Sequence, residues 1–196
     1  MAKGIWNAPN AVTIGRFFAT IVTFVILQYG FYLTAFVFFV LTALSDALDG
    51  YLARKYNMTS AFGRMADPIT DKVLSVGGFV LLMGLSPALI KPWMVVIIVA
   101  REFIVSGIRG YCESRGIAFG ADAGGKAKMV LQAISIGGAI FCLWAEHGPE
   151  WSAPFRSHGF INLIRVVVYM AVIATFSSGI NYMIRGYKIL REIEDA

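Results

Sequence analysis

The sequence predicts an all-α, polytopic membrane protein, and three observations support this fold class. Of its 196 residues, 58% are hydrophobic and only 15% are charged, whereas soluble domains have about 45–50% apolar and about 25% charged residues. The mean hydropathy is +0.69. Uncharged runs are long, the longest being residues 17–45. The chain lacks the polar surface of a soluble globule, and we expect residues 1–196 to form a single membrane domain.

Six segments reach the length of about 20 largely apolar residues that a transmembrane helix needs. The uncharged run at 17–45 is long for one helix, and Gln28, Tyr29 and Gly30 favour a turn that divides it into two. A hairpin places Asn10 and Arg16 on the same membrane side as Asp46, whereas a single span places them on opposite sides. The predicted spans are residues 10–28, 31–52, 71–89, 93–115, 126–144 and 160–187.

The limits of the later spans follow from helix-ending residues. Asp67 and Pro68 form a favourable pair of N-cap and first helical residue, and the third span follows them. Ser86-Pro87 marks its far end. The segment 147–158 contains two prolines and a glycine, which predicts a loop on the outer surface before the sixth span.

The distribution of cations predicts the orientation. Three of the 17 Lys and Arg residues lie inside spans; of the others, twelve fall on the side of the N-terminus and two on the opposite side. Cations concentrate on the cytosolic side of membrane proteins, so both termini are expected there. The net charge of +5 is explained by this topology and by anionic lipid, and we expect no nucleic-acid partner.

Four aspartates form the most informative pattern in the chain. Asp46 and Asp49 are spaced i,i+3 at the end of the second span, and Asp67 and Asp71 are spaced i,i+4 at the start of the third. Residues so spaced share one helix face. The hard oxygen ligands suit Mg²⁺, Mn²⁺ or Ca²⁺, and two such ions can stabilise the attacking and leaving oxygens of a phosphate. A polar site at the cytosolic face is therefore expected.

Charged residues inside the later spans suggest a second anion site, because they cost roughly 3 kcal/mol each in a membrane. Glu102 and Arg109 lie about 20° apart on a helical wheel. The cations Arg101 and Arg109, with Lys126 and Lys128 in the fifth span, could surround a phosphate on an acceptor molecule. The alternative is a structural Arg101–Glu102 ion pair with the two lysines as interfacial anchors.

The aspartate segment resembles the CDP-alcohol phosphatidyltransferases. Its pattern is D-x₂-D-G-x₂-A-R-x₈-G-x₃-D-x₃-D, eight fixed positions within 26 residues. The resemblance implies a six-helix membrane enzyme that transfers a phosphatidyl group from a CDP-linked lipid to an alcohol and releases CMP. It also implies that Asp46, Asp49, Asp67 and Asp71 hold Mg²⁺ or Mn²⁺, as two ions, and that Asp71 is the general base. Gly50, Ala53 and Arg54 would contact the CDP group.

Further segments look like those of the phosphatidylglycerophosphate synthases within that family. They are Pro9-Asn10-x₂-Thr13-x₂-Arg16, Arg101-Glu102-x₆-Arg109 and Gly125-Lys126-x-Lys128. The likeness implies CDP-diacylglycerol and glycerol-3-phosphate as substrates, in a bacterial cytoplasmic membrane. Asn10 and Thr13 would lie near the CDP group. The acceptor phosphate would be bound by Arg16, Arg101, Arg109, Lys126 and Lys128. A threonine commonly follows the second lysine in these enzymes, whereas this chain has Met129.

Alternatives remain at this stage. Inositol phosphate, inositol or serine are other acceptors for the same reaction, and an inositol-phosphate acceptor would need the same cations. A cation transporter is a different class of function; its ion site would lie near the membrane midplane between repeated halves, and no second half repeats the aspartates. Paired glycines at 77–78 and 137–138 permit close helix packing, within one chain or in a homodimer.

Overall fold

The computed structural model describes the backbone of residues 8–55, 61–117 and 123–194. Within these ranges the side chains of residues 8–11, 46–55, 61–65, 67, 123 and 192–194 lie outside the described set. The described chain is helical apart from short connections, with no strand in it, which confirms the all-α prediction. Its elements are α1 (Ala8–Gln28), α2 (Tyr32–Lys55), α3 (Ala61–Leu85), α4 (Pro92–Ser114), α5 (Ala123–His147), the 3₁₀ helix η1 (Glu150–Arg156) and α6 (His158–Glu194).

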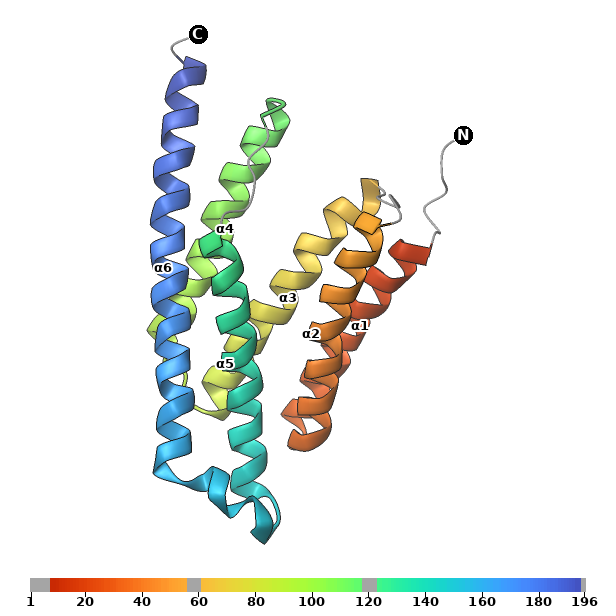
Figure 1. Cartoon of the computed structure of the whole chain (residues 1–196), viewed down its shortest axis with the longest axis vertical. Helices are drawn as coiled ribbons and strands as arrows, with labels where there is room; N and C mark the ends of the chain where they lie inside the picture. Colours follow the sequence, from red (N-terminus) through yellow and green to blue (C-terminus); the bar gives the residue numbers. More distant parts are fainter. Residues whose placement is uncertain (1–7, 56–60, 118–122, 195–196) are drawn as a thin grey trace.

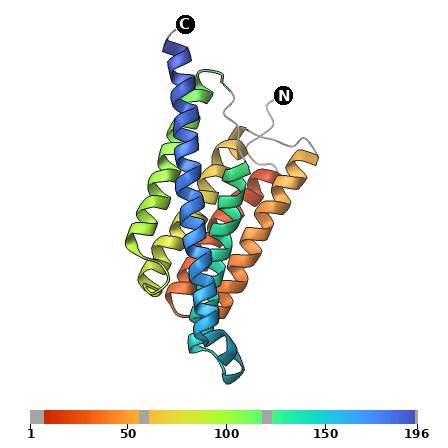
Figure 2. The same cartoon turned by 60° about the vertical axis from the view of Figure 1, so that its left-hand side comes forward.

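The helices form two groups that α5 joins. α1 packs against α2 and α3, while α6 packs against α4 and α5, and α5 also contacts α2 and α3. In Figure 1 the N-terminal ends of α1, α3 and α5 and the C-terminal ends of α2, α4 and α6 point toward the same end of the bundle. Figure 2 turns α6 to the front, between α4 and α5. The η1 segment lies at the opposite end from both chain termini (Figure 1).

The long uncharged run is a helical hairpin, as predicted. α1 ends at Gln28 and α2 begins at Tyr32. Gly30 has φ +83°, a conformation that glycine adopts without steric cost. The N–H of Gly30 donates to the carbonyl of Leu27 at 3.1 Å, and that of Phe31 donates to Ile26 at 3.2 Å. The hairpin returns the chain, so the start of α1 and the end of α2 lie at the same end of the bundle.

The predicted start of the third helix is wrong. α3 begins at Ala61, seven residues before Pro68, the predicted first helical residue, so Asp67 is not its N-cap and Pro68 lies inside it. Proline within a helix removes one backbone hydrogen bond and costs about 3 kcal/mol. The helix nevertheless continues through Pro68, and the hydroxyl of Thr70 donates to the carbonyl of Ala66 at 3.1 Å in the same turn. Asp67 and Asp71 therefore lie on a continuous helix.

The predicted outer loop contains a short helix. η1 occupies most of the segment between α5 and α6. Arg156 holds it against the end of α5, since its Nε donates to the carbonyl of Ala145 at 2.7 Å and its Nη2 donates to that of Gly148 at 2.6 Å. The rings of Trp144 and Trp151 pack with centroids 5.1 Å apart. The prolines and glycine of this segment predicted a loop, because they give no sign of the contacts that Arg156 and Trp151 make with the end of α5.

Length and composition are compatible with a membrane protein. Within the described residues, three helices are long and apolar enough to cross a bilayer, at 68–85 in α3, 124–147 in α5 and 158–191 in α6. α1 and α2 contain shorter apolar segments. Large apolar side chains also cover the outside of the bundle, among them Val96, Phe103 and Ile173. Extensive apolar surface of this kind favours lipid contact over water.

Glycines allow α3, α5 and α6 to approach closely. A Cβ atom on Gly78 would lie 2.9 Å from Cδ1 of Ile136, and one on Gly138 would lie 2.8 Å from Cδ1 of Ile164. Both distances are shorter than carbon atoms tolerate in packed proteins. Close approach through small residues is typical of membrane helices. Gly78 and Gly138 therefore serve packing within the chain, one of the two roles that the sequence left open.

We expect Gly138→Leu to destabilise the bundle, because the new side chain would collide with Ile164 and force α5 and α6 apart. Overpacking a core costs about 1–3 kcal/mol. Thermal unfolding in detergent should show a lower midpoint than for the unchanged protein. Gly107→Leu is the matched control, since nothing lies within 4 Å of a Cβ there. Equal midpoints for the two variants would contradict the assigned role of Gly138.

Candidate functional site

The aspartate segment lies where α2 ends and α3 begins. Asp46 and Asp49 are in the last ten residues of α2, and Asp67 and Asp71 are in the first half of α3. These parts of the two helices lie toward the same end of the bundle (Figure 1). Several predicted site residues are in described helices, but their side chains lie outside the described residues: Asn10, Asp46, Asp49, Gly50, Ala53, Arg54 and Asp67. Asp71 is the aspartate whose side chain is described.

Asp71 lies beside Arg16, which reaches it from α1. Nη1 of Arg16 is 3.8 Å from Oδ1 of Asp71, and the two side chains are 4% and 36% exposed. The pair depends on the hairpin, because only a turn at Gly30 brings the start of α1 back beside α3. Thr13 is also buried, one helical turn before Arg16. Asp71 thus presents a partly open carboxylate whose inner side contacts a buried guanidinium.

A second charged group lies between α4, α5 and α6. Oε1 of Glu102 accepts a hydrogen bond from Nη1 of Arg101 at 3.2 Å and another from Nζ of Lys128. The side chains of Arg101, Glu102 and Lys128 are 9%, 10% and 4% exposed. Both cations contact the same carboxylate oxygen. We call these three residues the Glu102 cluster.

The far side of Arg101 is held by α6. Nη2 of Arg101 donates to the hydroxyl of Ser178 at 2.9 Å, and its guanidinium lies 5.3 Å from the ring centroid of Tyr182. Such a cation–ring contact is worth about 0.5–2 kcal/mol. The side chain of Arg101 is therefore fixed on two sides, by the carboxylate and by α6.

Arg109 lies in the last six residues of α4, and Lys126 lies in the first turn of α5. Arg109 is half-buried and Lys126 is exposed. Among the described residues, the Nε atoms of Arg101 and Arg109 are buried without a hydrogen-bond partner. The predicted cations therefore fall into distinct places. Arg16 lies beside Asp71, Arg101 and Lys128 meet at Glu102, and Arg109 and Lys126 lie further along α4 and α5.

Sequence reasoning missed a polar contact beside the Glu102 cluster. Nε2 of Gln132 donates to the hydroxyl of Thr175 at 3.0 Å, and both side chains are almost fully buried. Gln132 is one turn beyond Lys128, and Thr175 is one turn before Ser178. Polar residues recurring every three or four positions in an apolar span were the signal that could have located this contact. Met129, by contrast, is 49% exposed and faces away from the cluster.

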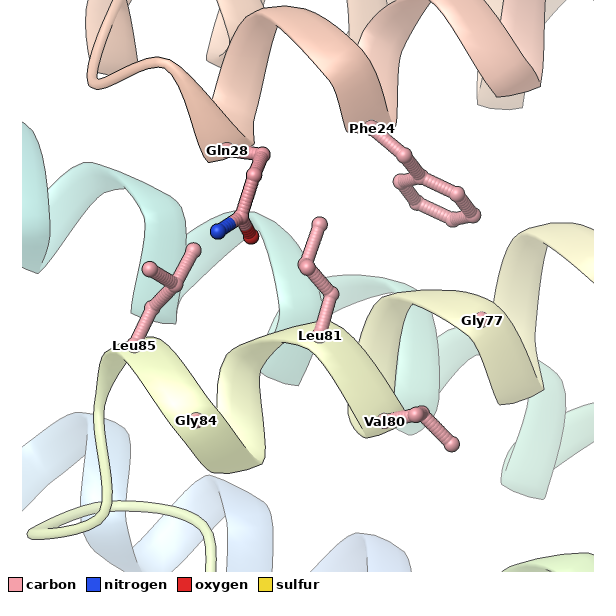
Figure 3. A pocket seen from close by; sticks show the side chains of 7 residues that line it. All are labelled: Phe24, Gln28, Gly77, Val80, Leu81, Gly84 and Leu85. Atoms are coloured by element: carbon pink, nitrogen blue, oxygen red, sulfur yellow. The ribbon is translucent and has the colours of Figure 1, made fainter.

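An apolar pocket of about 470 Å³ lies between α1 and α3. Figure 3 shows its lining side chains, with Phe24 and Gln28 on α1 facing Leu81 and Leu85 on α3. These residues belong to the ends of α1 and α3 that lie away from Asp71. None of the lining residues carries a charge, so the pocket is separate from both charged groups.

The chain is similar to a known family over most of its length. A model of the family described as CDP-alcohol phosphatidyltransferase matches residues 6–178. Three relatives share the name CDP-diacylglycerol–glycerol-3-phosphate 3-phosphatidyltransferase. The Rickettsia bellii protein is 37% identical over 133 residues, 66% of this chain and 72% of its own length. The Bacillus subtilis protein is 27% identical over 95% of this chain and 98% of its own. The Haemophilus influenzae protein is 29% identical over 91% and 92%.

Proposed function

This chain belongs to the CDP-alcohol phosphatidyltransferase family, and we propose that it transfers the phosphatidyl group of CDP-diacylglycerol to glycerol-3-phosphate, producing phosphatidylglycerophosphate and CMP. The observation that carries the proposal is similarity over nearly the whole chain. The Bacillus subtilis relative, whose name describes this reaction, aligns with 95% of the sequence. Residues 1–196 act in this proposal as one catalytic membrane domain.

Asp46, Asp49, Asp67 and Asp71 are the proposed ligands of two Mg²⁺ or Mn²⁺ ions. Among the described side chains no group of three or more His, Cys, Asp or Glu residues could hold a metal, and three of the four aspartates are not among them. The donor set fits these ions, because carboxylate oxygens are the hard ligands they prefer. When bound, such ions supply charge stabilisation for the pyrophosphate oxygens.

Asp71 is proposed as the general base. Its 36% exposure leaves the carboxylate open to a substrate hydroxyl. The carboxylate takes the proton of that hydroxyl as the oxygen bonds to the phosphorus of the phosphatidyl group and the bond to CMP breaks. General-base assistance of this kind contributes about 10²–10⁴-fold to rate. Arg16 holds the opposite side of the carboxylate.

The two substrates are proposed to bind on different sides of the aspartates. The CDP group of the lipid is assigned to α1 and α2 through Asn10, Thr13, Gly50, Ala53 and Arg54. Of the five cations that the resemblance assigns to the acceptor phosphate, Arg101 and Lys128 meet at Glu102 and are the proposed binding pair. Arg16 lies beside Asp71, and Arg109 and Lys126 lie further along α4 and α5. The Glu102 cluster supports this assignment, since it holds two buried cations and a single carboxylate. The buried, unpartnered Nε atoms of Arg101 and Arg109 are donors of the kind that a phosphate accepts.

We propose that all six α-helices span the bilayer, with both termini and the active site facing the cytosol of a bacterial cell. The positive-inside distribution supports this orientation, as does the placement of the aspartates toward the same end of the bundle as the termini (Figure 1). α6 has 37 residues, so at about 1.5 Å per residue it extends beyond a hydrocarbon core of about 30 Å.

The proposed reaction is tested by CMP release from CDP-diacylglycerol with a panel of acceptors. The purified protein in liposomes with Mg²⁺ should release CMP with glycerol-3-phosphate, and should not do so with inositol phosphate, inositol or serine. CMP release with inositol phosphate alone would reassign the acceptor. A folded protein that releases no CMP with any acceptor would refute the enzyme proposal.

A further inference from the structure

Glu102 occupies a position that the proposed reaction leaves without a role. It is a carboxylate inside the bundle, only 10% exposed. One of its oxygens, Oε1, accepts hydrogen bonds from both Arg101 on α4 and Lys128 on α5. Through Arg101 the same group reaches Ser178 on α6. The carboxylate thereby joins α4 to α5 directly, and to α6 through Arg101.

The charges of the Glu102 cluster do not cancel. Arg101 and Lys128 contribute two positive charges and Glu102 contributes one negative charge. An ordinary structural ion pair in a membrane would be neutral, because an uncompensated charge is costly there. Among the side chains that the structure describes at Glu102, one positive charge is in excess, and an anionic ligand would balance it.

The donors of Arg101 are also only partly used. A guanidinium has five N–H donors in a planar fork. Nη1 donates to Glu102 and Nη2 to Ser178, while Nε is buried and without a partner among the described residues. α6 accommodates the side chain because position 179 is glycine, where a Cβ would lie 3.0 Å from Cγ of Arg101. The guanidinium is therefore held in one orientation with a donor still available.

We propose that Glu102 is a positioning residue for the acceptor phosphate. It holds Arg101 and Lys128 in place before the substrate binds, and it leaves the three side chains with a net charge of one positive unit. This inference rests on the proposed function. Long cationic side chains lose rotamer entropy when they are held in place, and ordering them in advance makes phosphate binding more favourable. Without the carboxylate, the two cations would repel each other and separate.

The test measures the KM values for both substrates in Glu102→Gln and Glu102→Asp. Glutamine keeps the shape of the side chain and removes its charge. Aspartate keeps the charge but is one methylene group shorter, so its carboxylate lies further from Arg101 and Lys128. Comparing the two variants therefore distinguishes the effect of the charge from the effect of its position. In both variants we expect the KM for glycerol-3-phosphate to rise, by about 10- to 100-fold in the glutamine variant, while the KM for CDP-diacylglycerol changes less than about twofold. Glu113→Gln is the matched control, since it removes a carboxylate from an exposed position on the same helix.

The outcomes separate this inference from the proposed function. Suppose that the unchanged protein releases CMP with glycerol-3-phosphate and that the Glu102 variants have the same KM for this acceptor. That result would refute the role of Glu102 and leave the proposed reaction intact. A loss of kcat without a selective change in KM would show a merely structural role and would also refute it. An unchanged protein that does not use glycerol-3-phosphate would overturn both proposals. If Glu102→Gln does not fold, the KM of Glu102→Asp decides.

Discussion

Asp71→Asn is expected to lower CMP release by about 10²–10⁴-fold, the contribution of a general base. The amide that replaces the carboxylate cannot take the proton of the acceptor hydroxyl, and it is a poorer metal ligand. The KM for CDP-diacylglycerol should change less than kcat. Initial rates of CMP formation in liposomes, at saturating concentrations of both substrates, measure the effect.

Two further variants, Arg16→Gln and Arg16→Gln/Asp71→Asn, separate the loss of the base from the loss of an ion pair. Asp71→Asn removes the charge that faces Arg16, and Arg16→Gln/Asp71→Asn removes both charges together. The double variant restores the local charge balance, and we expect it to remain inactive because the base is still missing. The activity of Arg16→Gln alone measures how much of that loss comes from Arg16. Glu146→Gln, at an exposed position on the opposite end of the bundle, should retain full activity. Recovery of turnover in the double variant would remove Asp71 as the base.

Withdrawal of divalent cations is expected to have an effect of similar size. Metal ions contribute several kcal/mol of charge stabilisation to phosphoryl chemistry, and each 1.4 kcal/mol corresponds to about tenfold in rate. Treatment with EDTA should therefore reduce CMP release by about 10³-fold or more. Adding Mg²⁺ or Mn²⁺ in excess should restore it, because both accept carboxylate ligands.

The aspartates provide the specificity control for the metal experiment. Asp46→Asn and Asp49→Asn should raise the concentration of Mg²⁺ needed for half-maximal activity, whereas Glu113→Gln should not. Full activity in EDTA would refute the metal proposal, and it would leave the acceptor and the role of Glu102 to be judged by their own experiments.

Local patterns were sufficient for most of the helices. The hairpin at Gly30 was predictable because a bilayer limits the length of an apolar helix and glycine permits a positive φ. The start of α3 was not predictable in this way. Proline usually occurs in the first turn of a helix, but α3 begins at Ala61 and continues through Pro68. Local preferences of about 3 kcal/mol are small enough for the rest of the fold to override them.

The sequence by itself determined the class of the protein and the candidate residues of its site. Its apolar composition requires a helical membrane fold, because backbone groups in lipid must be paired within each segment. The spacing of the four aspartates indicates hard metal ligands near the end of the second helix and the beginning of the third. Both properties can be read from neighbouring residues.

Only the tertiary structure decided which charged residues meet. Arg16 contacts Asp71, and Lys128 and Arg101 share one oxygen of Glu102. These contacts depend on how each helix is rotated about its axis and where it crosses its neighbours, and those quantities arise from side-chain packing between distant segments. The sequence identified the candidate cations, and the packing of α4, α5 and α6 brought two of them, Arg101 and Lys128, to the carboxylate of Glu102.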